Sequence, residues 1–160
     1  MPSKVLEECS TLLKEKELTV SFAESATAGR VIAEFALLPH CGTILTGSLV
    51  CYDAGIKQDI LNVSHELVER HTPESAEVTE AMAKGLKDLI KSDIQVAVTG
   101  LTMPGGSENE EKPVGTMFVH VNYNGKSIAE RRTFDGTPEE IVLQTVDLVA
   151  QTIIDSVSGE

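Results

Sequence analysis

Apolar residues recur along the chain at two spacings, and each spacing predicts a type of secondary structure. Where they return every three or four positions, the pattern predicts a helix with one buried face. The predicted helices span residues 3–16, 27–38, 53–62 and 74–91, and a last helix runs from 137 to about 156. A cap at Thr72-Pro73 and a capping box from Thr137 to Glu140 mark two of the helix starts.

Shorter runs rich in apolar and β-branched residues predict strands. They span residues 19–23, 43–52, 94–100, 114–123 and 126–134. Asn124-Gly125 separates the last two runs and is the strongest short signal for a hairpin. Helices and strands alternate up to that hairpin, with room for one further helix before residue 72. The pattern therefore predicts an α/β fold, a three-layer α/β/α sandwich with a mixed, mainly parallel sheet, formed by a single domain over residues 1–160.

Composition and charge exclude several classes of partner. Of 160 residues, 41% are apolar and 24% are charged, which is ordinary for a globular domain. The net charge of −12 disfavours nucleic acid, because phosphate binding needs clustered Lys and Arg. The N-terminal segment lacks a signal-peptide core, and no apolar run approaches the roughly 18 residues of a membrane span. We therefore expect a cytoplasmic protein with no membrane partner.

Cysteines and histidines give no sign of a metal or redox site. Cys9, Cys41 and Cys51 lack C-x-x-C spacing, so they are expected to be free thiols that fill apolar space. The histidines are scattered without ligand spacing, and neither a P-loop nor a G-x-G-x-x-G motif is present. The sequence thus predicts neither a metal nor a cofactor.

The first candidate site lies where the strand at 19–23 meets the following helix. In open α/β sheets, ligands gather at the carboxyl ends of strands. Glu24 and Ser25 stand at this junction, and the backbone N–H groups of Thr27, Ala28 and Gly29 could hold a phosphate or an oxyanion. The alternative is that Ser25 or Thr27 is only a helix N-cap.

The second candidate is Tyr52 with Lys57. If Asp53 caps the next helix, Tyr52 and Lys57 occupy the two positions that pack together in a hydrophobic staple. A lysine that is partly desolvated in this way has a lowered pKa and can act as a base. The alternative is a solvated surface lysine above a buried tyrosine.

The third candidate is the long connection that follows Thr99-Gly100. Residues 101–113 have loop composition, and a loop of this length in a compact domain is usually functional or disordered. Gly105 and Gly106 permit close approach of the backbone to a ligand.

The same connection carries several charges. Three glutamates are expected to form a solvated rim, namely Glu108, Glu110 and Glu111. Lys112 lies where the chain re-enters a strand, so it either reaches a ligand phosphate or pairs with those glutamates.

Together these residues resemble one family. The run A-E-S-x-T, the later Tyr-x4-Lys and the segment V-T-G-x-x-x-P-G-G…E-K-P-V-G-T are similar to the C-terminal domain of the competence/damage-inducible CinA proteins. That family also includes stand-alone nicotinamide-nucleotide amidohydrolases. The resemblance runs from about residue 5 to 155, which is nearly the whole chain.

The resemblance implies an α/β/α fold and hydrolysis of the carboxamide of nicotinamide mononucleotide, which yields nicotinate mononucleotide and ammonia. By matching position, Ser25 would be the nucleophile, and Tyr52 and Lys57 would activate it. Such a site needs neither a metal nor a cofactor, and family members assemble into homo-oligomers. The candidate substrate-binding residues are Glu24, Thr27, Gly29, Thr99, Gly100, Gly105, Gly106 and Lys112.

The chain departs from the family pattern at several places, including residues 53–56 after the tyrosine and Leu101, Thr102 and Met103 in the glycine-rich loop, and two further departures bear most on the site. Ala26 and Ala28 stand where the family usually has Cys and Gly. Pro138, Val142 and Leu143 stand where the family commonly has arginines that are expected to help bind the substrate phosphate. Loss of such contacts costs roughly 1.5–3 kcal/mol each.

Three functions therefore remain open from the sequence. The chain is an amidohydrolase of nicotinamide mononucleotide, with Arg30 or Arg132 as a possible substitute for the missing arginines. Alternatively, it acts on a different and less anionic amide. As a third alternative, it is a binding or interaction module that has lost catalysis.

Overall fold

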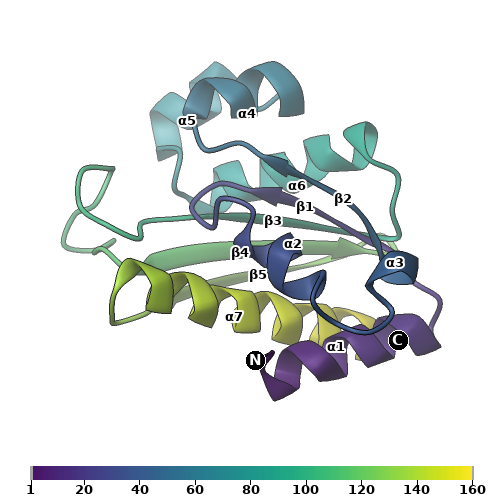
Figure 1. The fold of residues 1–160 in the computed structure, drawn as a ribbon. Coiled ribbons are helices and arrows are strands. Elements are labelled where there is room, and N and C mark those ends of the chain that lie inside the picture. Colours follow the sequence, from purple (N-terminus) through teal and green to yellow (C-terminus); the bar gives the residue numbers. More distant parts are fainter. Residues whose placement is uncertain (1, 160) are drawn as a thin grey trace.

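The computed structural model describes residues 2–159 and folds them around one five-stranded sheet (Figure 1). The strands are β1 (Val20–Glu24), β2 (Leu45–Val50), β3 (Ile94–Gly100), β4 (Thr116–Tyr123) and β5 (Lys126–Thr133). In the order β2-β1-β3-β4-β5, strand β1 pairs in parallel with β2 and β3, whereas β4 is antiparallel to β3 and β5. Only β4 points the opposite way, which confirms the predicted mixed, mainly parallel sheet.

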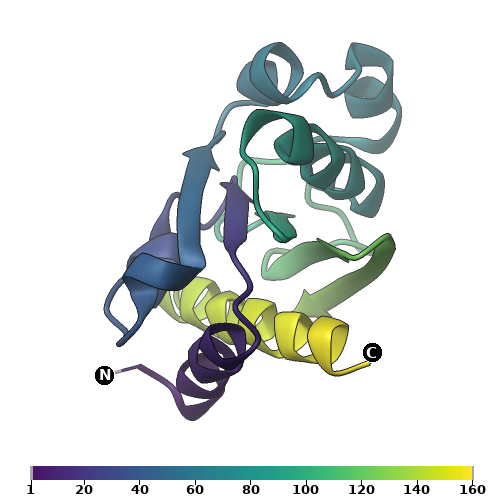
Figure 2. The same ribbon diagram turned by 90° about the vertical axis from the view of Figure 1, so that its right-hand side faces the viewer.

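Helices cover both faces of the sheet (Figure 1 and Figure 2). One layer contains α1 (Lys4–Glu15), α2 (Arg30–Phe35), α3 (Cys41–Ile44) and α7 (Pro138–Ser158). The opposite layer contains α4 (Ala54–Leu61), α5 (His65–His71) and α6 (Ala76–Leu89). This arrangement confirms the predicted three-layer α/β/α sandwich.

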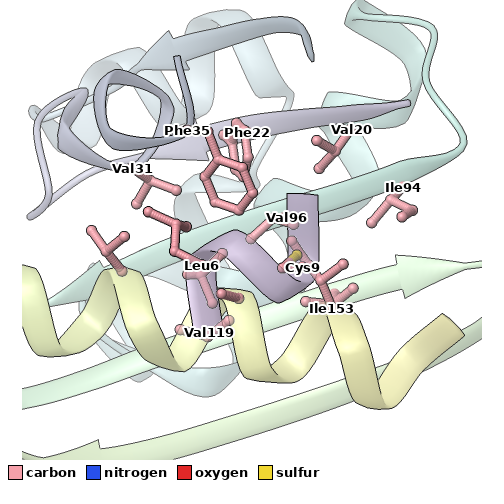
Figure 3. Packing of buried hydrophobic residues seen from close by; sticks show 14 of the residues in the cluster. Leu6, Cys9, Val20, Phe22, Val31, Phe35, Ile94, Val96, Val119 and Ile153 are labelled. Atoms are coloured by element: carbon pink, nitrogen blue, oxygen red, sulfur yellow. The ribbon is translucent and has the colours of Figure 1, made fainter. Parts of the chain in front are cut away.

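The sheet separates two apolar cores. Successive side chains of a strand point to opposite faces, so Phe22 and Ala23 of β1 enter different cores. In the larger core, the Phe22 and Phe35 rings lie 5.4 Å apart between centroids (Figure 3). In the smaller core, Ala23 and Ala97 are short, which leaves room for α6 to pack closely on the sheet. This packing fixes the two strands whose ends carry the candidate site.

Helix α7 is long and apolar enough to span a membrane by length and composition alone, with 21 residues and a mean hydropathy of 1.3. The core helix of a globular domain passes the same test, and 44% of this stretch is buried. Ile141, Val149 and Ile153 enter the larger core beside α1 and β4. Packing therefore accounts for the apolar face of α7.

The helix predicted over residues 27–38 is much shorter in the structure. Ala28 and Gly29 adopt left-handed backbone conformations, with φ of 48° and 93°, so α2 begins only at Arg30. Turns replace the helix after Phe35. The apolar spacing of this segment is satisfied by one and a half helical turns flanked by tight turns, which periodicity alone does not distinguish from a longer helix.

The predicted cap at Thr72-Pro73 is wrong. Thr72 has φ of 71° and ends α5. Ser75 instead caps α6, because its hydroxyl accepts a backbone N–H of the first helical turn. The helix predicted over 74–91 therefore begins at Ala76, and Pro73 lies outside it.

Other local signals hold, with one exception. Asn124 and Gly125 have φ of 51° and 76° and form the predicted hairpin turn between β4 and β5. Thr137 and Glu140 form the predicted capping box of α7. The exception is the strand predicted over 43–52, because residues 41–44 form the helix α3.

The left-handed backbone of Ala28 predicts a stability change. Ala28→Gly is expected to raise the free energy of unfolding by about 0.5–1 kcal/mol, because relief of the αL conformation exceeds the added entropy of the unfolded chain. Urea denaturation measures the change. Ala26→Gly is the matched control, since it removes the same methyl group without relieving a left-handed φ and should lower stability by about 1 kcal/mol. If Ala28→Gly is no more stable than this control, the turn is not strained.

Candidate functional site

The carboxyl ends of β1, β2 and β3 meet at one edge of the sheet, and each leads into a predicted site segment. Beyond the strands, the Ser25 N–H donates to the Val98 carbonyl at 3.0 Å and the Cys51 N–H donates to the Glu24 carbonyl at 2.8 Å. The three segments therefore stay side by side. They line an inner cavity of about 270 Å³, formed by Ser25, Ala26, Tyr52, Glu74 and residues 100–106.

Ser25 is nearly buried but not hydrogen-bonded through its hydroxyl. Its residue surface is 6% exposed, and among residues 2–159 its Oγ has no partner. Every fully enclosed side-chain oxygen or nitrogen in that part of the chain has a hydrogen-bond partner. Because Ser25 Oγ has none, it is not fully enclosed and stays open to the cavity. Helix α2 has no side-chain cap, so the alternative of Ser25 or Thr27 as an N-cap is wrong. The hydroxyl is free to meet a ligand.

Glu24 lies beneath this serine and is fully buried. Its carboxylate accepts hydrogen bonds from Thr27 Oγ1 at 2.8 Å, from the Val31 and Ile32 N–H groups at 2.9 and 3.2 Å, and from Ser48 Oγ at 3.0 Å. These bonds tie the start of α2 to β1 and β2. Glu24 does not line the inner cavity, so the structure makes it a residue that positions Ser25 and not a wall of the predicted substrate site.

The turn after Ser25 offers fewer backbone donors than predicted. The Ala28 N–H donates to the Ser25 carbonyl at 3.0 Å, which removes it from the predicted anion site. The N–H groups of Thr27 and Gly29 have no partner in the described part of the chain. These two remain available to an oxyanion.

Lys57 of α4 is 1% exposed, and its ammonium has no hydrogen-bond partner among the described residues. Every fully enclosed side-chain nitrogen among the described residues has a partner. Because Lys57 Nζ has none, the small exposed surface of Lys57 must include Nζ. Burial lowers the pKa of Lys57 from its ordinary value of 10.5, and Cys51, Glu74 and Asp53 oppose this shift. Glu74, one of the groups that act on Lys57, also lines the inner cavity, although Lys57 itself is not among the lining residues. The solvated-lysine alternative is therefore wrong.

Tyr52 has a different environment. Asp53 caps α4 as predicted, with its carboxylate accepting the Gly55 N–H at 2.9 Å. Tyr52 is 62% exposed at the mouth of the inner cavity, whereas Lys57 is buried within the protein. Among residues 2–159 no hydrogen bond joins the Tyr52 and Lys57 side chains. The phenol and the ammonium, which the sequence places beside each other, are therefore not bonded in the structure.

Close contacts or a left-handed backbone favour glycine at the end of β3 and in the connection that follows it. A Cβ on Gly100 would lie 2.7 Å from the Thr116 carbonyl oxygen, and one on Gly106 would lie 2.6 Å from Leu101 Cδ2. Gly105 has φ of 108°, and its N–H donates to Glu108 Oε2 at 2.8 Å. This bond lowers the pKa of Glu108. The glycines thus shape the cavity wall, and their close approach to a ligand stays a prediction.

Thr99 and Lys112 serve the framework of the site. The Thr99 hydroxyl is fully buried against Thr79 Oγ1 at 2.8 Å. Lys112 Nζ donates to Thr72 Oγ1, the Glu74 carbonyl and Ser107 Oγ at 2.7, 2.7 and 2.8 Å. All three ammonium protons are therefore used, which contradicts pairing with the loop glutamates and leaves none for a ligand phosphate.

Glu74 is a site residue that sequence reasoning missed. The predicted helix over 74–91 would include Glu74, but the residue precedes α6 and lines the inner cavity. Its Oε2 accepts a hydrogen bond from Ser107 Oγ at 2.5 Å. The signal that could have found it is Ser75, a good N-cap whose use places Glu74 outside the helix.

An outer groove of about 500 Å³ continues from the inner cavity. The two share Ala26, Tyr52, Thr102 and Met103. The remaining lining comes from the turn after Ser25, from α2 and from the first turns of α7, and consists of residues 27–30, Ala33, Pro138, Glu139 and Val142. The site therefore has a small inner part at Ser25 and a larger outer part at α7.

Arg30 is the cation of the outer groove among its described lining residues. Its Nε donates to Glu34 Oε1 at 2.7 Å, and its Nη1 lies 3.4 Å from Glu139 Oε2. Arg132 pairs with Glu130 on β5 and does not line the groove. One arginine between two carboxylates leaves this part of the site with a local charge of −1.

The cysteines lie apart from this chemistry. Cys9 and Cys51 are buried, and burial raises the pKa of their thiols to about 12 and about 11. Cys41 is half-buried, and all three are free thiols, as predicted. Within residues 2–159, no three His, Cys, Asp or Glu side chains are grouped so that they could hold a metal ion.

Comparison with known proteins identifies the family. The family model described as "CinA C-terminal domain" matches residues 2–157. The chain belongs to the CinA C-terminal domain family. A CinA-like protein of Pseudothermotoga lettingae is 37% identical over 119 residues, which are 74% of this chain and 29% of the relative. A CinA-like protein of Geotalea uraniireducens is 37% identical over 136 residues, which are 85% of this chain and 32% of the relative. The chain thus spans about a third of the length of these curated relatives.

Solved structures agree with the family and the fold. The competence/damage inducible protein CihA of Agrobacterium tumefaciens has a TM-score of 0.89 and 28% identity, covering 97% of both chains. A CinA superfamily protein of Klebsiella pneumoniae has a TM-score of 0.92 at 23% identity, covering 98% of both chains, and so supports the fold alone. The resemblance inferred from the motifs is confirmed.

Several positions at which this CinA C-terminal domain departs from the expected pattern line the outer groove, including Ala26, Ala28, Pro138 and Val142. Ala28 occupies a left-handed position that suits the family's glycine. Pro138 and Val142, where the resemblance expects arginines, both line the groove. The outer groove therefore lacks the cations that the resemblance leads us to expect at Pro138 and Val142.

Proposed function

We propose that this protein is an amidohydrolase that converts a small carboxamide to a carboxylate and ammonia. Ser25 is the nucleophile, and Lys57 is the base that activates it. One observation carries the proposal: a nearly buried, unpartnered hydroxyl opens into a cavity at the strand ends, and the helix that follows the neighbouring strand β2 holds a buried lysine whose ammonium has no partner among the described residues. A lowered pKa gives Lys57 a larger neutral fraction, and only the neutral amine accepts a proton.

The reaction proceeds in two halves. Ser25 Oγ attacks the carboxamide carbon while its proton passes to neutral Lys57 Nζ, and the N–H groups of Thr27 and Gly29 are available to the oxyanion. The C–N bond then breaks, and Lys57 returns the proton to the departing nitrogen, which leaves as ammonia. In the second half, water attacks the acyl-serine, and Lys57 takes one of its protons and returns it to Oγ. The product leaves as the carboxylic acid, which then ionises to the carboxylate.

The first candidate substrate is nicotinamide mononucleotide, in line with the family resemblance. The inner cavity would take the carboxamide and its ring, and the outer groove would take the rest of the molecule. Tyr52 lines both parts, so its ring is placed to contact the bound body of the substrate. We further propose that the reaction takes place in the cytoplasm, where the free thiols stay reduced.

The test is the release of ammonia and carboxylate, in equal amounts, from nicotinamide mononucleotide and a panel of other carboxamides. Steady turnover by the purified chain supports the proposal. Binding seen by calorimetry without turnover of any amide would instead support a CinA-like binding module.

A less anionic amide is the second candidate, and the outer groove favours it. Arg30 is paired with Glu34 and Glu139, and Pro138 and Val142 add no charge. With a net charge of −12 on the whole chain, this groove offers little to a phosphate dianion. Nicotinamide riboside, which lacks the phosphate, tests this candidate, and a higher kcat/KM for the riboside than for the mononucleotide would establish it.

A cation placed in the groove should restore a preference for phosphate. Val142→Arg is expected to raise the ratio of kcat/KM for mononucleotide over riboside by about tenfold, since one charge-assisted contact contributes roughly 1.5–3 kcal/mol. Val142→Gln is the uncharged control of similar length and should leave the ratio within about twofold. Equal ratios in the two variants would show that the substrate does not extend along α7.

A further inference from the structure

Glu74 holds the connection after β3 against the connection between α5 and α6. Its Oε2 accepts from Ser107 Oγ at 2.5 Å, and its carbonyl oxygen accepts from Lys112 Nζ at 2.7 Å and from Thr72 Oγ1 at 3.2 Å. Lys112 closes the network by donating to Ser107 and Thr72. Four residues from two separate segments thus share one set of hydrogen bonds at the edge of the inner cavity.

Glu74 is also the carboxylate that lines the inner cavity within the described part of the chain. A second cavity of about 400 Å³ lies on its other side, and Glu74 belongs to the walls of both. The carboxylate therefore stands between the nucleophile's cavity and Lys112. A negative charge in this position stabilises a nearby ammonium.

We propose that Glu74 is a positioning residue of the site, which holds the glycine-rich loop over the cavity through Ser107 and adds one of the negative charges that favour the ammonium of Lys57. This inference deepens the proposed function. Only the expected effect of Glu74 on turnover rests on that function, whereas the effects on the loop and on Lys57 do not. Glu74 raises the pKa of both Lys57 and Lys112, against the lowering by burial. Glu74 thereby favours the protonated form of Lys57. This matters in the proposed reaction because Lys57 must hold the proton that it returns to the leaving nitrogen.

Several other groups contribute to the electrostatics here. Cys51 and Asp53 also act on Lys57. The titratable and charged groups that surround Glu74 in the second cavity are His71, Glu77, Glu111, Lys112, Glu130 and Arg131. None of these groups lines the inner cavity, so a change at Glu74 alters the carboxylate in that cavity's wall while these groups stay in place.

Two substitutions separate charge from loop contact. Glu74→Gln removes the charge but keeps an oxygen that can accept from Ser107. Ser107→Ala keeps the charge but removes the hydroxyl that Glu74 and Lys112 both contact. The first should change the titration of Lys57, and the second should change the opening of the loop.

The experiment follows the Lys57 Cε resonance against pH in protein carrying ¹³C-labelled lysine, with Lys57→Met to assign the signal. Glu74→Gln should move the Lys57 titration to lower pH, because the charge that favours the ammonium is gone. Ser107→Ala should leave the titration in place but increase hydrogen exchange in residues 101–113 by about tenfold. An unchanged titration in Glu74→Gln, or an equal shift in Ser107→Ala, would overturn the proposal.

Kinetics then connect the titration to the reaction. The rising limb of kcat/KM against pH should move to lower pH in Glu74→Gln and stay in place in Ser107→Ala. Because the resonance reports on Lys57 without turnover, a shifted titration in a protein that hydrolyses no amide would reject the proposed function alone. A limb that stays in place while the resonance shifts would show that Lys57 is not the base.

Discussion

Replacing Ser25 by alanine is expected to lower kcat for carboxamide hydrolysis by at least about 10³-fold. The hydroxyl has no partner among the described residues, so its loss leaves no protein group unsatisfied. Fold and substrate binding should therefore survive, and calorimetry should give a Kd within about threefold of the wild-type value. The loss would then lie in the chemical step.

Ser21→Ala is the matched control for this prediction. Ser21 belongs to β1, the strand that leads to Ser25, and is fully buried, but it bonds Ser92 and does not line the inner cavity. Its substitution should leave kcat within about threefold. If Ser25→Ala retains more than about a tenth of the wild-type kcat, another residue is the nucleophile.

Replacing Lys57 by methionine should change activity and stability in opposite directions. Loss of the general base is expected to lower kcat by about 10³-fold. At neutral pH the free energy of unfolding should rise by about 1 kcal/mol, because a buried and unpartnered ammonium is replaced by an apolar chain of similar length. Ammonia release and urea denaturation measure the two effects on the same preparation.

The stability gain should depend on pH in a defined direction. The pKa of Lys57 is lowered in the folded protein, so the folded state binds fewer protons than the unfolded state between that pKa and 10.5. The penalty from the ammonium is complete below the folded pKa and disappears as the pH approaches 10.5. The advantage of Lys57→Met should thus shrink between pH 7 and pH 10. A variant that is less stable than wild type at neutral pH would contradict the unpaired, buried ammonium.

Local signals in the sequence predicted most of the fold because each is satisfied within a few residues. Asn124-Gly125 fixed a hairpin, and the Thr137–Glu140 box fixed the start of α7. The start of α2 was different, because the residue that satisfies its first N–H groups is Glu24 on the preceding strand. Apolar spacing does not report such a contact, and so the predicted helix was too long.

The candidate site was likewise predictable in its position but not in the roles of all its residues. The rule for strand ends correctly brought Ser25, Tyr52 and the glycine-rich loop to one cavity. The roles of Lys112 and Glu74 depended on partners about forty residues away, such as Thr72 for Lys112. No spacing along the chain encodes those partners, because they arise from the packing of the α5–α6 connection against the loop.

The charge of the outer groove could be foreseen only in part. The absence of arginines at Pro138 and Val142 is visible in the sequence, but their place in the groove wall needed the fold. The same is true of Arg30, whose two carboxylate partners come from its own helix and from α7. Sequence alone could name Arg30 and Arg132 as substitutes, and the structure retains only Arg30 at the site.

Detection of an acyl group on Ser25 tests the proposed chemistry most directly. An ester analogue of the best amide carries an easier leaving group, so acylation should outpace hydrolysis and the acyl-enzyme should accumulate. After acid quenching and trypsin digestion, the peptide of residues 17–30 should gain the mass of the acyl group, with fragmentation placing it on Ser25. Turnover of the ester with this peptide unmodified, or with the acyl group on another residue, would contradict the assignment of Ser25 as the nucleophile.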